Sequence, residues 1–232
     1  LKRQGFSSIS ILQNKKATRK VVLRELKALL VGSSDNDTLV FYISSHGTSI
    51  PDLNGDEADG KDEAFCLYDN VLVDDDIRKH IRKYRRSKAL IIFVCDCCHS
   101  GTITREFVPY QNTATTKSNG SYMKMKYLPP EDDAVAAQIG KMKGRKDSIP
   151  QEQMEDLVMS GCKAHEFSYE MRLGGKTHGA LTYFICKHIK ENTDITYGQL
   201  AVLVSNSVGK NSGKRQHPQL EGMKENKKRK AF

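Results

Sequence analysis

Two apolar runs, each broken by a polar cluster, form the strongest pattern in the sequence. The first covers residues 38–43 (TLVFYI) and leads into Ser44, Ser45, His46 and Gly47; the second covers residues 89–94 (ALIIFV) and leads into residues 95–101 (CDCCHSG). Continuous apolar runs rich in Ile and Val are typical of strands buried on both faces. Ligands bind outside the carboxyl ends of such strands in open α/β sheets. The pattern therefore predicts that a His and a Cys follow neighbouring strand ends.

Helical patterns alternate with these strands. Apolar positions 22, 26, 29 and 30 follow Thr18, which predicts a capped helix to about Val31. Three aspartates at 74–76 favour a helix start there, since acidic residues complement the helix dipole. Further strands are expected at 8–12, 64–67, 156–162 and 217–222, and further helices at 133–142, at 179–190 and after the capping box of residues 196–199. Strand–helix–strand alternation predicts an α/β fold with a mostly parallel sheet flanked by helices.

Composition narrows the class of protein. The chain has 232 residues, a net charge of +9 and six cysteines without a disulfide-framework spacing, which favours a reducing compartment such as the cytoplasm. No apolar run approaches the roughly 20 residues that cross a membrane, and no signal peptide is recognisable. The first residue is not Met, which predicts a fragment, a processed form or an excised domain. Residues 103–150 are polar and Lys-rich, so we expect a long irregular connection there.

Cys98 and His46 are the candidate catalytic pair. They are 52 residues apart, which is the spacing of the caspase class. A thiolate is a nucleophile, and a neighbouring imidazole can generate it. The alternative for any single Cys is a small buried hydrophobe, which we expect for Cys95 and Cys97. A zinc site is disfavoured, because no CxxC pair occurs and adjacent strand residues point to opposite faces.

The chain resembles the metacaspases and related caspase-fold cysteine peptidases. The segments that carry the resemblance are residues 42–47 (YISSHG), 59–69 (DGKDEAFCLYD), 73–77 (VDDDI), 96–101 (DCCHSG), 157–162 (LVMSGC), 178–183 (HGALTY) and 218–222 (PQLEG). The resemblance implies a three-layer caspase-like fold. It also implies a large-subunit-like part at 1–105, a flexible basic linker at 106–153, a small-subunit-like part at 154–222 and a basic tail at 223–232. The family commonly begins with a further strand and helix, which this chain is expected to lack.

Site roles also follow from the resemblance. Cys98 would be the nucleophile, His46 the general base and acid, and the backbone N–H groups of Gly47 and Cys98 the oxyanion hole. Asp96 and Ser44 would line the S1 pocket, where a carboxylate favours Arg or Lys before the cleaved bond. The alternative for Asp96 is that it caps a helix starting near Cys98.

Calcium activation is a further expectation from the resemblance, through Asp74 and Asp75. It is weakened because the position seven residues after the nucleophile, an acidic ligand in many family members, is Arg105 here. The alternative is that the aspartates cap a helix. An EF-hand is rejected, because Glu57 stands at the turn position that requires Gly in residues 52–63.

The resemblance makes proteins or peptides with a basic residue before the cut bond the expected partners. The chain itself offers candidate self-cleavage sites at Arg105, Lys117, Lys124, Lys126, Lys143 and Arg145. Neither membrane nor nucleic-acid binding is expected. The basic residues 227–230 (KKRK) are either a solvated end or a nuclear import signal, which leaves the nucleus as a second location. A catalytically silent caspase-fold scaffold or regulatory binding module is the alternative function.

Overall fold

A mixed four-stranded sheet forms the centre of the molecule. The computed structural model describes residues 1–51, 61–98, 115–118, 121–139, 155–163 and 166–232. The strand order is β1 (Thr38–Ser44), β5 (Leu90–Asp96), β8 (Leu157–Ser160) and β11 (Gln219–Glu221). The first three strands are parallel and β11 is antiparallel to β8. The predicted α/β fold with a mostly parallel sheet is confirmed.

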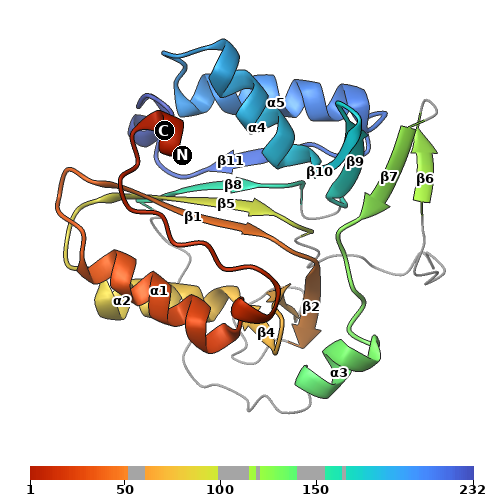
Figure 1. Cartoon of the computed structure of the whole chain (residues 1–232), viewed down its shortest axis with the longest axis horizontal. Coiled ribbons are helices and arrows are strands. Elements are labelled where there is room, and N and C mark those ends of the chain that lie inside the picture. The colour runs from red at the N-terminus through yellow and green to blue at the C-terminus, as the bar shows by residue number, and fades with distance from the viewer. Residues whose placement is uncertain (52–60, 99–114, 119–120, 140–154, 164–165) are drawn as a thin grey trace.

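Helices cover both faces of this sheet. Figure 1 shows α1 (Arg19–Val31) and α2 (Asp74–Tyr84) below it, and α4 (Ala180–Glu191) and α5 (Tyr197–Asn211) above it. All seven positions of β5 are buried. Leu90, Ile92 and Val94 pack toward α4 and α5, whereas Ile91, Phe93 and Cys95 pack toward α1 and α2. The apolar run therefore supplies both cores by alternation, as expected of a strand covered on two sides.

The helix starts follow the capping residues in the sequence. The Thr18 hydroxyl accepts a hydrogen bond from the Val21 N–H at 3.4 Å. At α5, Thr196 and Gln199 form both hydrogen bonds of a capping box. The α2 helix begins at Asp74, where three aspartates occupy its first turn.

A small antiparallel sheet continues from the end of β1. It consists of β2 (Gly47–Pro51), β3 (Lys61–Cys66) and β4 (Val71–Val73) in that order. An apolar cluster, here called the small-sheet cluster, packs on it and comprises Ile50, Ala64, Val71, Val73 and Val135. The helix α3 (Asp133–Ile139) supplies Val135 and lies beside β2 and β4 (Figure 1).

A second antiparallel sheet was largely unexpected. Its order is β10 (Lys176–Gly179), β9 (Tyr169–Leu173), β7 (Ser121–Met125) and β6 (Thr115–Ser118). The β6–β7 hairpin and α3 lie within residues 103–150, where we expected an irregular connection with one short helix. The turn between β9 and β10 uses Gly174 and Gly175, both with positive φ, so this Gly-Gly pair was a hairpin signal. The expected strand at 8–12 is wrong, since those residues are in no strand.

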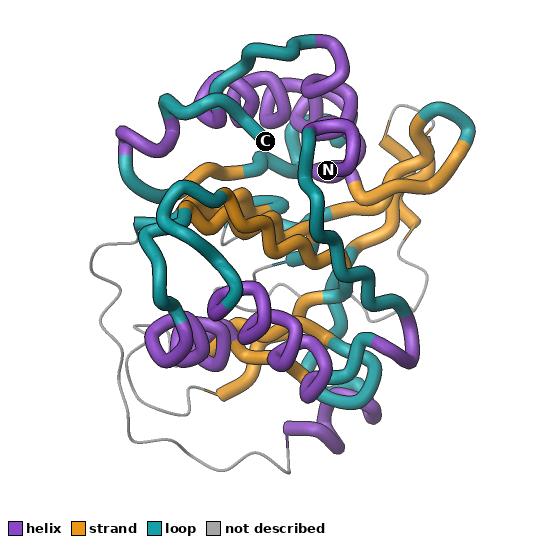
Figure 2. The backbone as a smooth tube through the Cα atoms, turned by 60° about the vertical axis from the view of Figure 1, so that its left-hand side comes forward, coloured by secondary structure: helices purple, strands orange, loops and turns teal. Residues whose placement is uncertain are grey.

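The C-terminal residues are fixed to α5. The Arg229 carbonyl accepts from the Tyr197 N–H at 3.0 Å, and the Phe232 N–H donates to the Tyr197 hydroxyl at 2.9 Å. A short helix, α6 (Lys224–Lys227), precedes this contact. The two termini lie close together in Figures 1 and 2. The basic end is thus docked rather than free, and its role in nuclear import stays a prediction.

Candidate active site

The pairing of β1 with β5 brings the two polar clusters to one edge of the sheet. Ser44 of β1 pairs with Asp96 of β5. His46 and Cys98 each follow this pair by two residues, so both come at the same distance beyond the strand ends. The chains approach so closely beyond the strand ends that a Cβ at Gly47 would overlap the Cys98 carbonyl oxygen. Glycine is needed there because any larger residue would push the two strand ends apart.

The Cys98 thiol is buried and held by one backbone unit. Cys98 is 2% exposed. The Ser168 N–H donates to Sγ at 3.1 Å, and Sγ lies 3.5 Å from the Ser168 carbonyl oxygen. Ser168 directly precedes β9, so the loop after β8 fixes the position of the sulfur.

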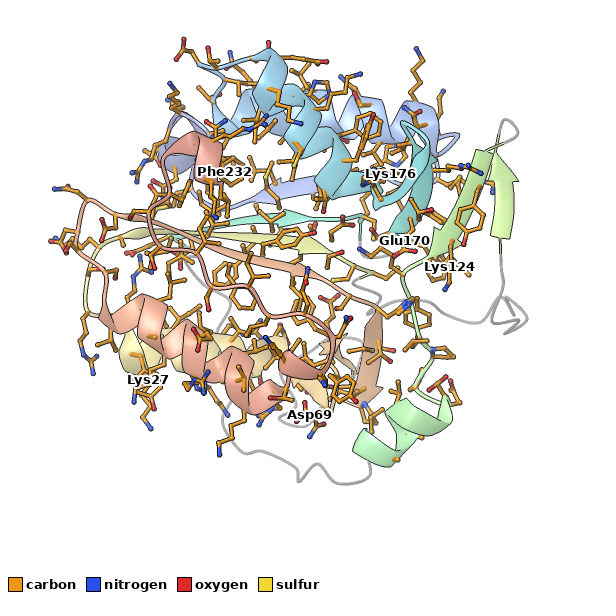
Figure 3. The ribbon with its side chains drawn as sticks, viewed as in Figure 1. Lys27, Asp69, Lys124, Glu170, Lys176 and Phe232 are labelled. Carbon is orange, nitrogen blue, oxygen red and sulfur yellow. The ribbon has the colours of Figure 1, made fainter. Side chains whose placement is uncertain are left out.

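His46 follows β1 and is partly buried. Burial lowers the pKa of His46 below its ordinary value, and the ammonium groups of Lys124 and Lys126 lower it further, while Glu170 and Asp132 act in the opposite direction. Lys124 and Glu170 are cross-strand partners on β7 and β9 (Figure 3). In the described part of the chain, no group lies within hydrogen-bond distance of His46 Nδ1. The imidazole is therefore neutral at neutral pH, which is the form that accepts a proton.

The side chain of Lys126 fills the predicted S1 pocket. Its Nζ lies 3.2 Å from an Asp96 carboxylate oxygen and donates to the Ser44 hydroxyl at 2.7 Å. Lys126 is 2% exposed and Asp96 is 0% exposed. A lysine is almost never buried this deeply unless it is paired. Asp96 and Ser44 are thus brought together, and they bind a basic side chain of the same chain.

Asp96 also caps a helix. Its carboxylate accepts hydrogen bonds from the Thr182 N–H at 3.1 Å, from the Thr182 hydroxyl and from the Ser168 hydroxyl at 3.4 Å. Thr182 lies in the first turn of α4, and a Cβ at Gly179, the N-cap, would overlap the carboxylate. The capped helix is therefore α4; the helix expected near Cys98 lies outside the described residues.

The backbone of Lys126 lies against both predicted oxyanion-hole groups. Its carbonyl oxygen accepts from the Gly47 N–H at 2.9 Å and from the Cys98 N–H at 3.4 Å. Its own N–H donates to the Ser168 carbonyl at 2.9 Å, and the Leu128 N–H donates to the Gly47 carbonyl at 2.9 Å. Two N–H groups that converge on one carbonyl oxygen are the arrangement that stabilises a tetrahedral oxyanion. The carbonyl of the Lys126–Tyr127 peptide bond therefore lies against the backbone of Cys98.

Residues 121–128 form an extended strand through the site. Met123, Lys124 and Met125 pair antiparallel with Met171, Glu170 and Tyr169 of β9. Tyr127 continues with a parallel bridge to Gly47. This is strand addition, the mode in which extended peptides bind at a sheet edge.

Three polar residues that complete the site were missed from the sequence. Gln216 is fully buried, donates to the Gly161 carbonyl at 2.7 Å and the Ser168 hydroxyl at 3.2 Å, and accepts from the Tyr169 N–H at 3.1 Å. It thereby fixes the loop that holds Cys98. Ser168 and Gln216 stand in segments without a local signal, whereas Thr182 lies in the segment 178–183 that carried the family resemblance.

Two of the remaining candidate cleavage sites lie within strands of the second antiparallel sheet. Lys124 lies in β7, and the backbone of Lys117 lies in β6. Arg105, Lys143 and Arg145 lie outside the described residues.

The acidic residues proposed for calcium hold an arginine instead. Arg78 forms ion pairs of 2.6 Å with both Asp74 and Asp75. Burial raises the pKa of Asp74 to about 7 against the effect of Arg78. Among the residues that the structure describes, no group of three or more His, Cys, Asp or Glu is arranged to hold a metal. The described residues around Asp74 and Asp75 therefore do not fit a calcium ion.

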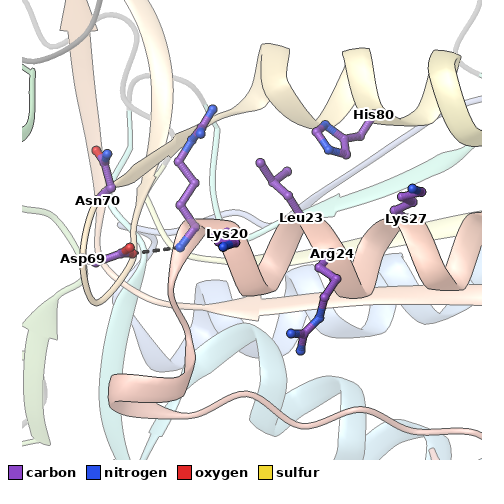
Figure 4. Close-up of a pocket in the computed structure, with 8 residues that line it drawn as sticks. Lys20, Leu23, Arg24, Lys27, Asp69, Asn70 and His80 are labelled. Carbon is purple, nitrogen blue, oxygen red and sulfur yellow. Dashed lines mark hydrogen bonds between the residues drawn. The ribbon is translucent and has the colours of Figure 1, made fainter.

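A surface cavity of about 460 Å³ lies between α1 and α2, away from the strand ends. Figure 4 shows its lining, which is mainly basic: Lys20, Arg24, Lys27 and His80 surround Leu23, with Asp69 and Asn70 at one end. Neither Cys98 nor His46 lines it.

The family model for the caspase domain of C14 peptidases matches residues 1–228. The chain belongs to the caspase-domain peptidases. Its relatives include metacaspase-3 of Arabidopsis thaliana, which is 30% identical over 82% of this chain and 49% of its own length. Metacaspase-1A of Aspergillus fumigatus is 27% identical over 79% of this chain and 50% of its own length. The chain therefore spans about half the length of these relatives, and the comparison supports a caspase-like cysteine peptidase.

A solved structure confirms the fold of this caspase-domain chain. The crystal structure of a Geobacter sulfurreducens protein superposes with a TM-score of 0.74 at 21% identity, covering 100% of this chain and 84% of that one. None of the helices within the described ranges has the length and apolar character to span a bilayer.

Proposed function

We propose that this protein is a cysteine endopeptidase that cleaves after Lys or Arg and that cuts its own chain between Lys126 and Tyr127. Cys98 is the nucleophile and His46 the general base. The observation that supports this most is the place of Lys126. Its ammonium group meets Asp96 while its carbonyl oxygen meets the N–H groups of Gly47 and Cys98.

The chemistry follows from these groups. Neutral His46 takes the thiol proton, and the Cys98 sulfur attacks the Lys126 carbonyl carbon. The negative charge that develops on the carbonyl oxygen is stabilised by the two N–H groups. Imidazolium then donates its proton to the Tyr127 nitrogen, which leaves as a free amine and a thioester remains on Cys98. His46 next deprotonates a water molecule, whose oxygen displaces the thiol and leaves a carboxylate on Lys126.

Charge determines which side chain precedes the cut bond. A substrate Asp in S1 would place a second carboxylate against the buried Asp96, and like charges at that distance repel strongly. Lys and Arg instead form a buried ion pair, and Ser44 accepts one further hydrogen bond. Protein and peptide substrates with a basic residue before the cut bond are the partners this site favours.

Self-cleavage would also control the enzyme. Because residues 121–128 fill the site, another substrate binds only after this segment leaves. Cutting the Lys126–Tyr127 bond divides the segment into two shorter pieces, each with fewer contacts than the whole. The intact chain is therefore a latent form.

The test is the identity of the new chain end. Purified wild-type protein, Cys98→Ala, Lys126→Met and the neighbouring control Lys124→Met are incubated and analysed by intact-mass spectrometry and N-terminal sequencing. We expect a fragment that begins at Tyr127 in wild type and in Lys124→Met, and none in Cys98→Ala or Lys126→Met.

A peptide panel with Arg, Lys or Asp before the bond tests cleavage of other chains. Cleavage after Asp would contradict the S1 assignment. Absence of both self-cleavage and peptide cleavage, with no preferential labelling of Cys98 by a thiol-reactive probe, would leave the catalytically silent scaffold as the better description.

A further inference from the structure

The residues that follow the Lys126–Tyr127 bond are bound as closely as those that precede it. Tyr127 extends the edge of β2 through its bridge to Gly47. Its ring packs edge-on against Phe167, with 5.8 Å between ring centroids and an interplanar angle of 60°. Its hydroxyl shares a hydrogen bond with the side chain of Ser49, which is itself buried. A tyrosine thus has both an aromatic partner and a polar partner at this position.

The next residue enters an apolar environment. Leu128 packs against the small-sheet cluster of β2, β3 and β4. The chain then turns, with the Asp132 N–H donating to the Pro129 carbonyl at 3.0 Å, and α3 returns Val135 to the same cluster. Tyr127 and Leu128 are contacted by Phe167, Ser49 and the small-sheet cluster. We call these three together the primed-side site.

We propose that the primed-side site selects substrates with tyrosine and then an aliphatic residue directly after the cut bond. This inference rests on the proposed function, since it takes residues 121–128 as a bound substrate. The substrate class is therefore an extended protein segment of the form Lys/Arg–Tyr–aliphatic, and residues 126–128 (KYL) are its first example. Phe167 and Ser49 are the specificity-determining residues at the first position after the bond.

The contacts explain why other residues bind less well. Phenylalanine keeps the edge-on ring contact but leaves the buried Ser49 hydroxyl without this partner, and alanine loses both interactions. An acidic residue at the Leu128 position would place a partly buried charge against the apolar small-sheet cluster. From typical strengths of these interactions, we expect kcat/KM to fall about 3-fold for Tyr→Phe, about 10-fold for Tyr→Ala and at least 10-fold for Leu→Asp.

The experiment compares peptides that share one unprimed half. Internally quenched peptides carry the sequence of residues 121–130 with Tyr, Phe or Ala at the Tyr127 position, or with Leu or Asp at the Leu128 position. A fifth substrate carries residues 121–126 followed by a coumarin amide and so has no primed residues. Every substrate must displace the same segment of the enzyme, so that common cost cancels in the ratios of kcat/KM.

The matched enzyme variants are Phe167→Ala and the control Tyr68→Ala. Tyr68 is an exposed aromatic residue in the turn between β3 and β4. We expect the Tyr-to-Ala preference to fall from about 10-fold to about 2-fold in Phe167→Ala and to persist in Tyr68→Ala. Because the readout is a ratio within each enzyme, a general loss of activity does not imitate it.

The peptide rates distinguish the primed-side site from the endopeptidase activity itself. Turnover of the coumarin substrate with equal rates for all primed peptides would overturn the primed-side site and leave the endopeptidase standing. Absence of turnover of every substrate would overturn both. A Tyr preference that Phe167→Ala leaves unchanged would overturn the assignment of Phe167.

Discussion

The buried ion pair between Lys126 and Asp96 gives the sharpest prediction about stability. With 3.2 Å between Nζ and the carboxylate oxygen, Coulomb's law gives an attraction of about 5 kcal/mol at an effective dielectric constant of about 20. Hydrogen bonds from Thr182 and Ser168 also stabilise the carboxylate, so part of this attraction is replaced when the lysine is removed. We therefore expect a coupling energy of about 2–4 kcal/mol between the two side chains.

A double-mutant cycle measures this coupling. Lys126→Met, Asp96→Asn and the double variant are made in a Cys98→Ala background, which prevents self-cleavage, and their free energies of unfolding are obtained from urea titrations. The control is the exposed pair Lys230–Asp194, which has a similar contact distance of 2.8 Å in open solvent. No measurable coupling is expected there, because solvent and salt screen the charges.

Equal coupling in the two cycles would contradict the burial of the Lys126–Asp96 pair. In that case the 2% and 0% exposures of Lys126 and Asp96 would not describe the protein in solution, and the S1 pocket would stand open. Lys126→Met alone is not decisive, since it also leaves the buried Asp96 carboxylate without its cation.

Three further predictions concern the surroundings of the site. Gly179→Ala places a methyl group on the Asp96 carboxylate, so the free energy of unfolding should fall by about 1–3 kcal/mol in urea titrations; unchanged stability would contradict the contact. Lys124→Ala removes a charge that lowers the pKa of His46, so this pKa should rise. The acid limb of the pH profile of self-cleavage, measured on gels, should then move to higher pH. A shift to lower pH would contradict the role of His46 as base. Arg78→Ala removes the cation that is paired with both Asp74 and Asp75, so calcium should raise its melting temperature and leave that of wild type unchanged; an equal rise in both would show that Arg78 does not exclude the ion.

The central layers could be predicted because their signals are local. The run from Leu90 to Val94 is apolar at every position, and it supplies two cores. Thr18 and Thr196 cap the helices that follow them. The burial of a strand or helix face and the capping of a helix end depend on residues that are close in sequence. Both can therefore be predicted from the sequence alone.

The second sheet and the choice of Lys126 depend on contacts between distant segments. β7 pairs with β9 across 46 positions, as in Lys124 with Glu170, and such pairing leaves no trace in either segment alone. The alternation of Met and Lys in residues 123–126 was a period-two signal that indicated a strand. It would have placed Lys126 on the solvent face, whereas Asp96 provides the buried partner. The sequence offered six basic residues as equal candidates for self-cleavage. Of the three that the structure describes, Lys126 is the one whose side chain reaches Asp96 at the end of β5.

In the proposed peptidase, the double contact of Asp96 links specificity to folding. The same carboxylate that faces Lys126 accepts the Thr182 N–H in the first turn of α4. Loss of a capping acceptor typically costs about 1 kcal/mol in helix stability. A descendant that changed its cleavage preference by replacing Asp96 would in general also lose the cap of α4. Asn and Ser can still accept a hydrogen bond from an N–H, so they would destabilise the helix least. Evolution toward another cleavage preference is therefore restricted to the few residues that can hold α4 in place, or it must first stabilise that helix elsewhere.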